Sequence, residues 1–394
     1  MIEVHQGRLQ TPFHAKQKAL DGLNRWHNWN GYTVPDALYC ADLEYFAIRN
    51  ATAVFDLSPM NKYRITGPDA FAFLDRLLTR DLSALKPGRV VYGVWCDGAG
   101  KVIEDGTVFR LGDEDFRLCC AGRHAAWFAD SARGFDVDIV EETADVAALA
   151  VQGPTSFSVL QRMGIEGLDS LKLFGHTSVD FRGRELLISR TGFTGDLGYE
   201  LWLEPAHAEA VWDALFDAGE LTGIRAIGTE ALELSRIEAT YLAPGIEFLP
   251  ADETIRNDRS RSPFELGLNW LVDFGKPVFN GRAALANERR EGSTWQLVRL
   301  DIEGNKPARD AYVYAKPGKA DIGFVTSAAW SPVCKQNIAL ATVRAPHGQP
   351  GTQLWVEIYY QREMHWQRKM ARATVTTGPF WNPERRRVTP PYPY

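Results

Sequence analysis

Two adjacent carboxylates stand in the segment DGAGKVIEDGT (residues 97–107), at Glu104 and Asp105. The glycines before Lys101 suggest a phosphate loop, but that motif requires G-x-x-x-x-G-K-[ST] followed by a helix, and the apolar residues after Lys101 indicate a strand. Successive residues of a strand point to opposite faces of its sheet, so only one of the two acids can enter a given cleft. That acid would suit proton transfer; the alternative is that both are surface charges.

A further acid follows the glycine-rich segment SRTGFTGDLGYELWL (residues 189–203). A dinucleotide fingerprint requires a helix after its glycines, whereas YELWL has the alternation of a strand, so the segment is predicted to be a hairpin. The alternation places Glu200 and Trp202 on one face. Glu200 is then either a surface acid or a bidentate acceptor for a ligand with two adjacent N–H donors, such as a pterin or a guanine.

Three other candidates are single residues with ordinary structural alternatives. Arg236 lies on a predicted helix, where it can pair with Glu233 one turn away or contact a ligand. Tyr241 follows that helix and is either a packing aromatic residue or a proton donor. Arg309 lies in a predicted loop and suits a carboxylate partner without specifying one.

Several classes of site are not indicated by any motif. The five cysteines include no C-x-x-C pair, the eight histidines are dispersed, and the chain has no H-E-x-x-H, G-x-S-x-G or EF-hand pattern. We therefore expect no metal site and no disulfide framework.

The charge pattern argues against nucleic-acid and membrane partners. Acidic residues outnumber basic residues by 50 to 44, and the basic residues are scattered along the chain. No segment reaches the roughly 18 uninterrupted apolar residues of a membrane span, and the first residues lack the pattern of a secretory signal. We expect a cytoplasmic protein.

The elements that must position these residues are indicated by two similar segments. ITGPDAFAFLDR (residues 65–76) and VQGPTSFSVLQR (residues 151–162) both place Gly-Pro between a strand-like run and a helix-like run, which predicts two strand-then-helix units. Helices are also predicted over residues 206–215 and 229–239. After a polar stretch suited to a linker (residues 287–293), four short strand-like runs predict a small β-barrel or sandwich. The proline-rich tail from Gly378 is expected to be an extended arm.

Taken together, these segments resemble the glycine-cleavage T-protein, or aminomethyltransferase, family of tetrahydrofolate-dependent enzymes. The resemblance is carried, in the family's order, by AIRNATAVFDLSPM, ITGPDAFAFLDRLLTRDLSALKPGR, GKVIEDG, RTGFTGDLGYE, LSRIEA, SPFELGLNWLVDFGKPVFNGRAAL and GFVTSAAWSPVCKQNIALA. It implies an α+β fold in the form of a three-lobed disc with a central hole. Residues 1–288 would form two folate-binding lobes, and residues 289–394 a C-terminal β-barrel domain with an extended tail.

The resemblance also implies roles for particular residues. Asp105 matches the family's catalytic carboxylate, and Glu200 matches the acid that binds the 2-amino and N3 edge of the pterin of tetrahydrofolate. Arg236, Arg309 and Tyr92 match residues near the folate. If the donor is a methyl ether, Tyr241 is the hydroxyl that we expect to protonate the leaving oxygen.

Departures from the family pattern concern the donor. The family's S-H-M-G is replaced by residues 58–61, SPMN, its Asp-Asp pair by Glu104-Asp105, and its L-E-A-G by residues 237–240, IEAT. The folate contacts are retained and the donor side is changed, so we expect transfer of a methyl group from a small O-, N- or S-methyl compound to tetrahydrofolate. The alternatives are a true aminomethyltransferase of the glycine cleavage system, with a lipoyl carrier protein as partner, and a non-catalytic folate-binding module.

Overall fold

The two Gly-Pro segments each join a strand to a helix, as predicted. In the computed structural model, which describes residues 9–255 and 258–392, β4 (Asn61–Thr66) leads into α3 (Ala70–Leu77), and β9 (Ala147–Gln152) leads into α5 (Ser156–Arg162). The two units belong to different sheets, so the similar segments are strand-to-helix connections that occur once in each of two lobes. In each helix, apolar residues spaced at helical intervals are buried against the sheet, which is why each unit folds back on its strand.

The first lobe is a five-stranded sheet covered on one face by helices. Its strand order is β5-β6-β7-β4-β8, and every recorded pairing is antiparallel. Helices α3 and α4 pack on one face through a cluster of apolar side chains that includes Phe73, Leu74 and Phe128. Its other strands and helix are β5 (Arg89–Cys96), β6 (Val102–Arg110), β7 (Asp115–Cys120), α4 (Ala125–Ser131) and β8 (Asp138–Glu141).

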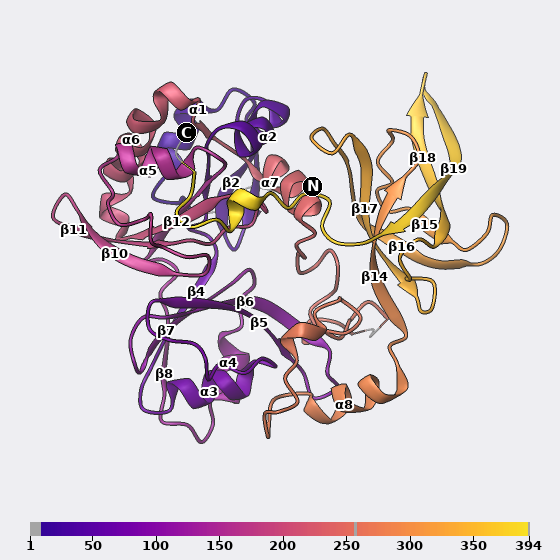
Figure 1. Cartoon of the computed structure of the whole chain (residues 1–394), viewed down its shortest axis with the longest axis horizontal. Coiled ribbons are helices and arrows are strands. Elements are labelled where there is room, and N and C mark those ends of the chain that lie inside the picture. The colour runs from indigo at the N-terminus through magenta and orange to yellow at the C-terminus, as the bar shows by residue number, and fades with distance from the viewer. Residues whose placement is uncertain (1–8, 256–257, 393–394) are drawn as a thin grey trace.

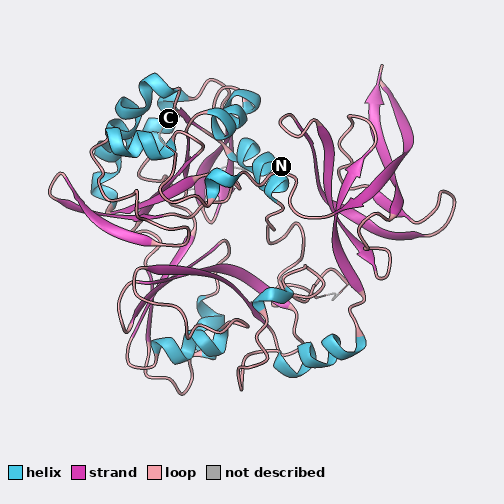
Figure 2. Ribbon diagram, viewed as in Figure 1, coloured by secondary structure: helices cyan, strands magenta, loops and turns pink. Residues whose placement is uncertain are grey.

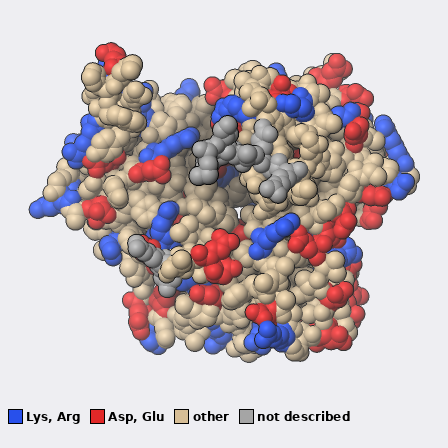
Figure 3. Space-filling view, turned by 180° about the vertical axis from the view of Figure 1, so that it is seen from behind, with Lys and Arg blue, Asp and Glu red and all other residues tan. Residues whose placement is uncertain are grey.

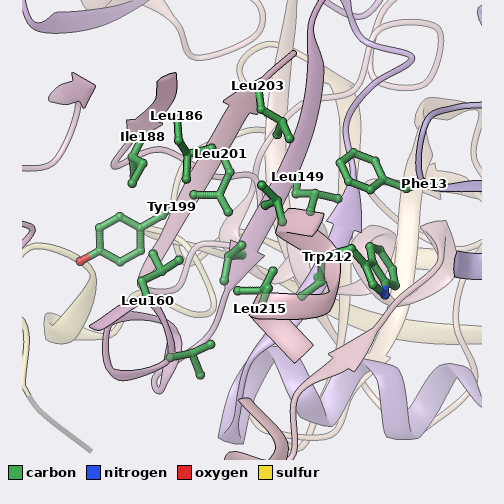
Figure 4. Close-up of a cluster of buried hydrophobic side chains, with 14 of the residues drawn as sticks. Phe13, Leu149, Leu160, Leu186, Ile188, Tyr199, Leu201, Leu203, Trp212 and Leu215 are labelled. Atoms are coloured by element: carbon green, nitrogen blue, oxygen red, sulfur yellow. The ribbon is translucent and has the colours of Figure 1, made fainter. Parts of the chain in front are cut away.

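The second lobe is a six-stranded mixed sheet between two layers of helices. Its order is β10-β11-β12-β9-β3-β13, with β13 parallel to β3. Tyr199, Leu201 and Leu203 of β12 point into the apolar cluster beneath α5 and α6 (Figure 4). The remaining elements are α1 (His14–Leu20), β1 (Arg25–Trp29), β2 (Tyr32–Ala37), α2 (Ala41–Asn50), β3 (Ala53–Asp56), β10 (His176–Phe181), β11 (Arg184–Ser189), β12 (Gly198–Leu203), α6 (Ala208–Gly219), β13 (Arg225–Ala226) and α7 (Thr229–Ala239).

The third lobe is a closed six-stranded barrel in the order β14-β17-β16-β15-β18-β19. The sequence predicted four of its strands; the short β15 and the charged β19 were not predicted. Most of the polar stretch expected as a linker (residues 287–293) lies within α8, which ends at Glu291. The division of the chain into domains at residue 288 stays a prediction. The bounds are α8 (Arg282–Glu291), β14 (Trp295–Ile302), β15 (Tyr312–Tyr314), β16 (Asp321–Ser331), β17 (Gln336–Arg344), β18 (Gln353–Arg362) and β19 (His365–Thr376).

The three lobes surround the middle of a disc (Figure 1), with the sheets nearest the middle and several helices at the periphery (Figure 2). The predicted α+β, three-lobed architecture with a C-terminal barrel is therefore confirmed. On the face seen in Figure 3, acidic and basic side chains are interspersed. Within the described part of the chain, no helix combines the length and apolarity needed to cross a membrane.

The C-terminal tail leaves the barrel and returns across the second lobe. Its short 3-10 helix (Glu384–Arg386) places Arg385 against Asp196, with Nε 2.6 Å from Oδ1. Arg190 donates hydrogen bonds to the carbonyl of Val388 (2.7 Å) and to the hydroxyl of Thr389 (2.8 Å). The tail is therefore held by side chains of the glycine-rich segment, although its proline content alone suggested a free extended arm.

A buried ion pair links this tail to the helices. The side chain of Arg49 on α2 is fully buried and donates to Glu238 on α7 (2.6 Å) and to the carbonyl of Thr194 (2.9 Å). Asp196 lies 3.5 Å from the same guanidinium. The hydroxyls of Tyr45 and Ser331 donate to the other oxygen of Glu238. Helix α2, helix α7, the hairpin, the tail and the barrel therefore meet at one charged cluster.

Replacing Arg49 by methionine is expected to lower the free energy of unfolding by about 3–5 kcal/mol, because it leaves the carboxylate of Glu238 buried without its cation. Equilibrium unfolding in urea measures this loss. The matched control is Arg25→Met, which removes an exposed pair with Glu230 and should cost less than about 1 kcal/mol. Equal effects of the two substitutions would contradict the assignment.

Candidate active site

Asp105 and Tyr92 lie side by side on adjacent strands. β5 and β6 pair with Val94 opposite Asp105, which places Tyr92 and Asp105 diagonally on one face of the sheet. The Tyr92 hydroxyl donates a 2.6 Å hydrogen bond to Oδ2 of Asp105. Burial, and then the neighbouring Glu104, raise the pKa of Asp105 well above its ordinary value. The structure therefore brings together a carboxyl group with a raised pKa and a hydroxyl that fixes its orientation.

Glu104 faces the opposite side of the sheet, as strand alternation predicts, but it is not solvated. Its side chain is buried, where it accepts a hydrogen bond from the backbone N–H of Gly122 (3.0 Å) and lies 3.3 Å from Nε2 of His124. Burial disfavours the charged imidazole, but Glu104 and Asp252 outweigh burial and raise the pKa of His124. Glu104 therefore has an internal partner, and its negative charge acts on Asp105 through the sheet.

Glu200 lies on β12 in the second lobe, half-buried and opposite Ser189 of β11. Thr191 donates a short hydrogen bond to Oε2, and Ser189 donates to the same oxygen at 3.4 Å. Burial raises the pKa of Glu200 to about 7, and these two hydroxyls oppose the rise. Among residues 9–255 and 258–392, no hydrogen bond reaches Oε1, so one carboxyl oxygen remains available to a ligand.

The hairpin that carries Glu200 packs against helix α7, and its glycines permit that contact. At Gly195, φ is +73°, and a Cβ would lie 2.4 Å from the Cβ of Ala239. Trp202, on the same face as Glu200, is buried against Phe109 of the first lobe. Burial is the main cause of the raised pKa of Cys119 on β7, and the nearby Glu200 adds to the rise. The face of Glu200 therefore points toward the first lobe.

Aromatic side chains gather around these carboxyl groups. Phe193 in the hairpin stacks on Tyr241 at a ring distance of 5.5 Å, and Trp270 lies 6.2 Å from the ring of Tyr92. Trp270 is 60% exposed, so its ring is accessible to a ligand. Burial raises the pKa of Tyr241, while Arg386, Arg387 and Arg49 oppose the rise. Sequence reasoning missed Phe193 and Trp270 because an isolated aromatic residue has no local signature of exposure.

Arg236 lies at the junction of α7 and the barrel, where its guanidinium has protein partners. Its side chain is fully buried, and its five N–H groups have protein acceptors: two on Glu233 and one each on Glu247, Ser327 and the carbonyl of Tyr241. The predicted pair with Glu233 is present. Arg236 thus joins α7 to β16 of the barrel and fixes the backbone that carries Tyr241, and a direct folate contact stays a prediction.

Arg309 lies apart from the other candidates. It is exposed in the turn between β14 and β15, and within residues 9–255 and 258–392 no hydrogen bond or ion pair joins it to Asp105, Glu200 or Tyr241. Its role in folate binding stays a prediction from the resemblance.

The site fits a flat heterocycle better than a metal ion. Glu200 offers an unpaired carboxyl oxygen, and exposed aromatic faces lie near both Tyr92 and Tyr241. In the described segments, no group of three or more His, Cys, Asp or Glu side chains is arranged to hold a metal. A pterin has adjacent N–H donors on a planar ring, which suit the carboxyl acceptor of Glu200 and the aromatic faces that are present.

Replacing Glu200 by glutamine is expected to stabilise the ligand-free protein more at pH 8 than at pH 5. A carboxyl group whose pKa rises from 4.5 to about 7 on folding costs stability as the pH rises through that window, and glutamine has no such cost. Thermal unfolding midpoints at the two pH values measure the difference. Glu204→Gln, an exposed acid after the same strand, is the control and should show little dependence. A pH-independent change at Glu200 would show that its charge is not destabilising.

Two family models and several known proteins match this chain over most of its length. Residues 13–276 match the GCVT N-terminal domain family, and residues 296–382 match the glycine cleavage T-protein C-terminal barrel domain. The chain is 32% identical to an aminomethyltransferase of Halothermothrix orenii over 353 residues, covering 89% of this chain and 95% of that protein. It is 35% identical over 393 residues to a trimethylamine-oxide aldolase of Ruegeria pomeroyi, covering 96% of this chain and 48% of that protein.

The fold is shared with the crystal structure of the glycine cleavage system aminomethyltransferase T from Bartonella henselae. The two align with a TM-score of 0.83 and 23% identity, over 95% of this chain and 98% of the other. Since the family matches cover both parts of the chain, and a relative above 30% identity is covered almost completely, the chain belongs to the glycine cleavage T-protein family, as its sequence motifs predicted.

Proposed function

We propose that the protein is a tetrahydrofolate-dependent transferase that moves a methyl group from a small O-, N- or S-methyl donor to tetrahydrofolate. The observation that carries the proposal is the Asp105–Tyr92 pair, a half-buried carboxyl group oriented by a 2.6 Å hydrogen bond. The face of β12 that carries Glu200 points toward the same lobe. Membership of the T-protein family supports the folate-dependent class.

Each residue has a distinct task in this proposal. Bound tetrahydrofolate would supply a nucleophilic ring nitrogen. Glu200, with Oε1 available, would accept the adjacent N–H groups of the pterin and so orient the ring. Asp105 would accept a proton or stabilise developing positive charge, and its raised pKa makes it a stronger base than an exposed aspartate. Tyr92 would keep the carboxyl oriented.

Tyr241 would protonate a leaving oxygen if the donor is an ether. Its ring is held by Phe193, and its carbonyl accepts a hydrogen bond from Arg236 (3.1 Å), so its position is well determined. Burial raises its pKa, which makes the hydroxyl a weaker acid and limits this role to basic leaving groups. Unchanged turnover in Tyr241→Phe would remove the assignment.

The choice of donor rests on the residues that depart from the family and on one relative. The relative named trimethylamine-oxide aldolase, whose name specifies a small N-methyl compound, shares 35% identity with nearly the whole chain. The second candidate, a glycine-cleavage aminomethyltransferase with a lipoyl carrier partner, is favoured by relatives of that name at 31–34% identity. Assays with methylated amines and with an aminomethyl-lipoyl carrier protein separate the two.

Glu200→Ala is expected to weaken tetrahydrofolate binding by about 2–4 kcal/mol, since it removes a charged, partly buried hydrogen-bond acceptor. In the unsubstituted protein, affinity should fall about tenfold per pH unit below pH 7, because protonation of Glu200 removes an acceptor, and should level off above it. Calorimetry at several pH values measures both effects. Unchanged affinity in the variant would contradict the placement of the pterin.

Asp105→Asn should leave tetrahydrofolate affinity within about threefold while lowering kcat by about 100-fold or more, because the amide retains the shape but cannot accept the proton. Steady-state kinetics with a methyl donor, combined with binding calorimetry, separates the two effects. Glu104→Gln on the opposite face is the control and should reduce kcat much less. A normal rate in Asp105→Asn would exclude this residue from the chemistry.

A further inference from the structure

A cavity of about 350 Å³ lies between the barrel and the segment that follows α7. Its walls come from β14 and β17, from the segment around the 3-10 helix Asn269–Leu271, and from Thr240 at the end of α7. The volume is within the range of small-molecule sites, which begins at roughly 300 Å³.

The guanidinium of Arg299 lines this cavity, and the part of the chain that the structure describes offers it no hydrogen-bond or ion-pair partner. The side chains of Val298, Leu300 and Ile302 fill the barrel, so alternation along β14 directs Arg299 to the outside. Its Nε is buried without a hydrogen bond, and across residues 9–255 and 258–392 no ion pair reaches the group. The side chain as a whole is half-buried, and this burial lowers the pKa of Arg299. An unpaired buried donor is costly unless a ligand satisfies it.

The surroundings of Arg299 are positive and partly apolar. The described lining residues include no Asp or Glu. The ring of Trp295, which forms one wall, lies 4.5 Å from the guanidinium of Arg344 and 4.9 Å from that of Arg261. Two acids lie behind the walls, and both have partners: Glu265 is paired with Lys101 at 2.7 Å, and Glu288 accepts hydrogen bonds from Ser262 (2.7 Å) and from Ser293 (2.6 Å). The other walls combine apolar side chains with neutral hydrogen-bonding groups: Phe264, Leu266, Leu297, Leu340, Thr240, Asn269 and Gln296.

We propose that this cavity binds an organic acid, with its carboxylate on the guanidinium of Arg299 and its apolar body against Trp295 and Phe264. The planar fork of an arginine matches the two oxygens of a carboxylate, and the neutral amides can satisfy further lone pairs. The carboxylate can come from a small organic acid or from the glutamate of a folate. The second source rests on the proposed function; the first does not.

The test is calorimetric titration of the full chain with two probes, benzoate and 4-aminobenzoylglutamate. Arg299→Gln should weaken binding of at least one probe 10-fold or more, and Arg299→Lys should restore part of the loss because the charge returns without the fork. The control is Arg362→Gln, an exposed barrel arginine far along β18, which should bind as the unsubstituted protein does.

The pattern of loss identifies the source of the carboxylate. Loss of benzoate binding indicates a small acid, and loss confined to 4-aminobenzoylglutamate indicates the folate glutamate. Absence of binding of both probes at millimolar concentration, or equal affinities in Arg299→Gln and the unsubstituted protein, would overturn the proposal. Thermal midpoints of the variants with and without benzoate show that each variant is folded and whether the probe still stabilises it. Glu200→Ala should leave benzoate binding intact, so failure of the folate site is distinguishable from failure of this cavity.

Discussion

The buried guanidinium of Arg49 constrains the region around the candidate site more than any apolar contact does. A cation without access to water must satisfy its hydrogen bonds within the protein, and Arg49 does so with Glu238, Asp196 and the carbonyl of Thr194. These acceptors come from α7 and from the hairpin, so the position of α2 determines how the hairpin lies against α7. Glu200 lies on β12 of that hairpin, so this cluster helps to determine its position.

Charged clusters of this kind lie at the joints between lobes, beside apolar contacts such as that of Trp202 with Phe109. Arg236 connects α7 to the barrel through Glu247 and Ser327. Arg49 connects α2 to Glu238 of α7, and Glu238 in turn accepts a hydrogen bond from Ser331 of the barrel. Hydrogen bonds to charged groups depend on direction as well as distance, so they define the relative placement of lobes more sharply than apolar packing alone. The barrel is thereby fixed relative to the residues that carry the proposed chemistry.

The carboxyl groups of the candidate site differ because their environments differ. Asp105 and Glu200 are half-buried with few donors, and their pKa values rise. Glu104, one residue from Asp105, is fully buried but has a backbone N–H and His124 as partners. A carboxyl group left short of partners is unfavourable for folding and useful for binding, because a ligand can supply the missing donors.

Local patterns in the sequence determined a good part of this protein. Strand alternation separated Glu104 from Asp105 and paired Glu200 with Trp202, helical periodicity located α7, and ordered family motifs identified the three-lobed fold. These properties depend on residues close together in the chain, so the backbone periods of 2 and 3.6 residues are sufficient to read them. The strand β19 was not predicted because the first five of its residues are exposed and mostly polar, and apolar alternation begins only at Ala371.

Partner identity was decided only by the tertiary structure. Nothing in the sequence shows that Glu247 and Ser327 accept hydrogen bonds from Arg236, or that His124 lies against Glu104. Nor does it show that Arg190 and Asp196 bind the tail. The same holds for the unpaired guanidinium of Arg299. Each of these facts depends on side chains that are far apart in sequence and meet only when the lobes pack, and burial, which sets the pKa values, is a property of that packing.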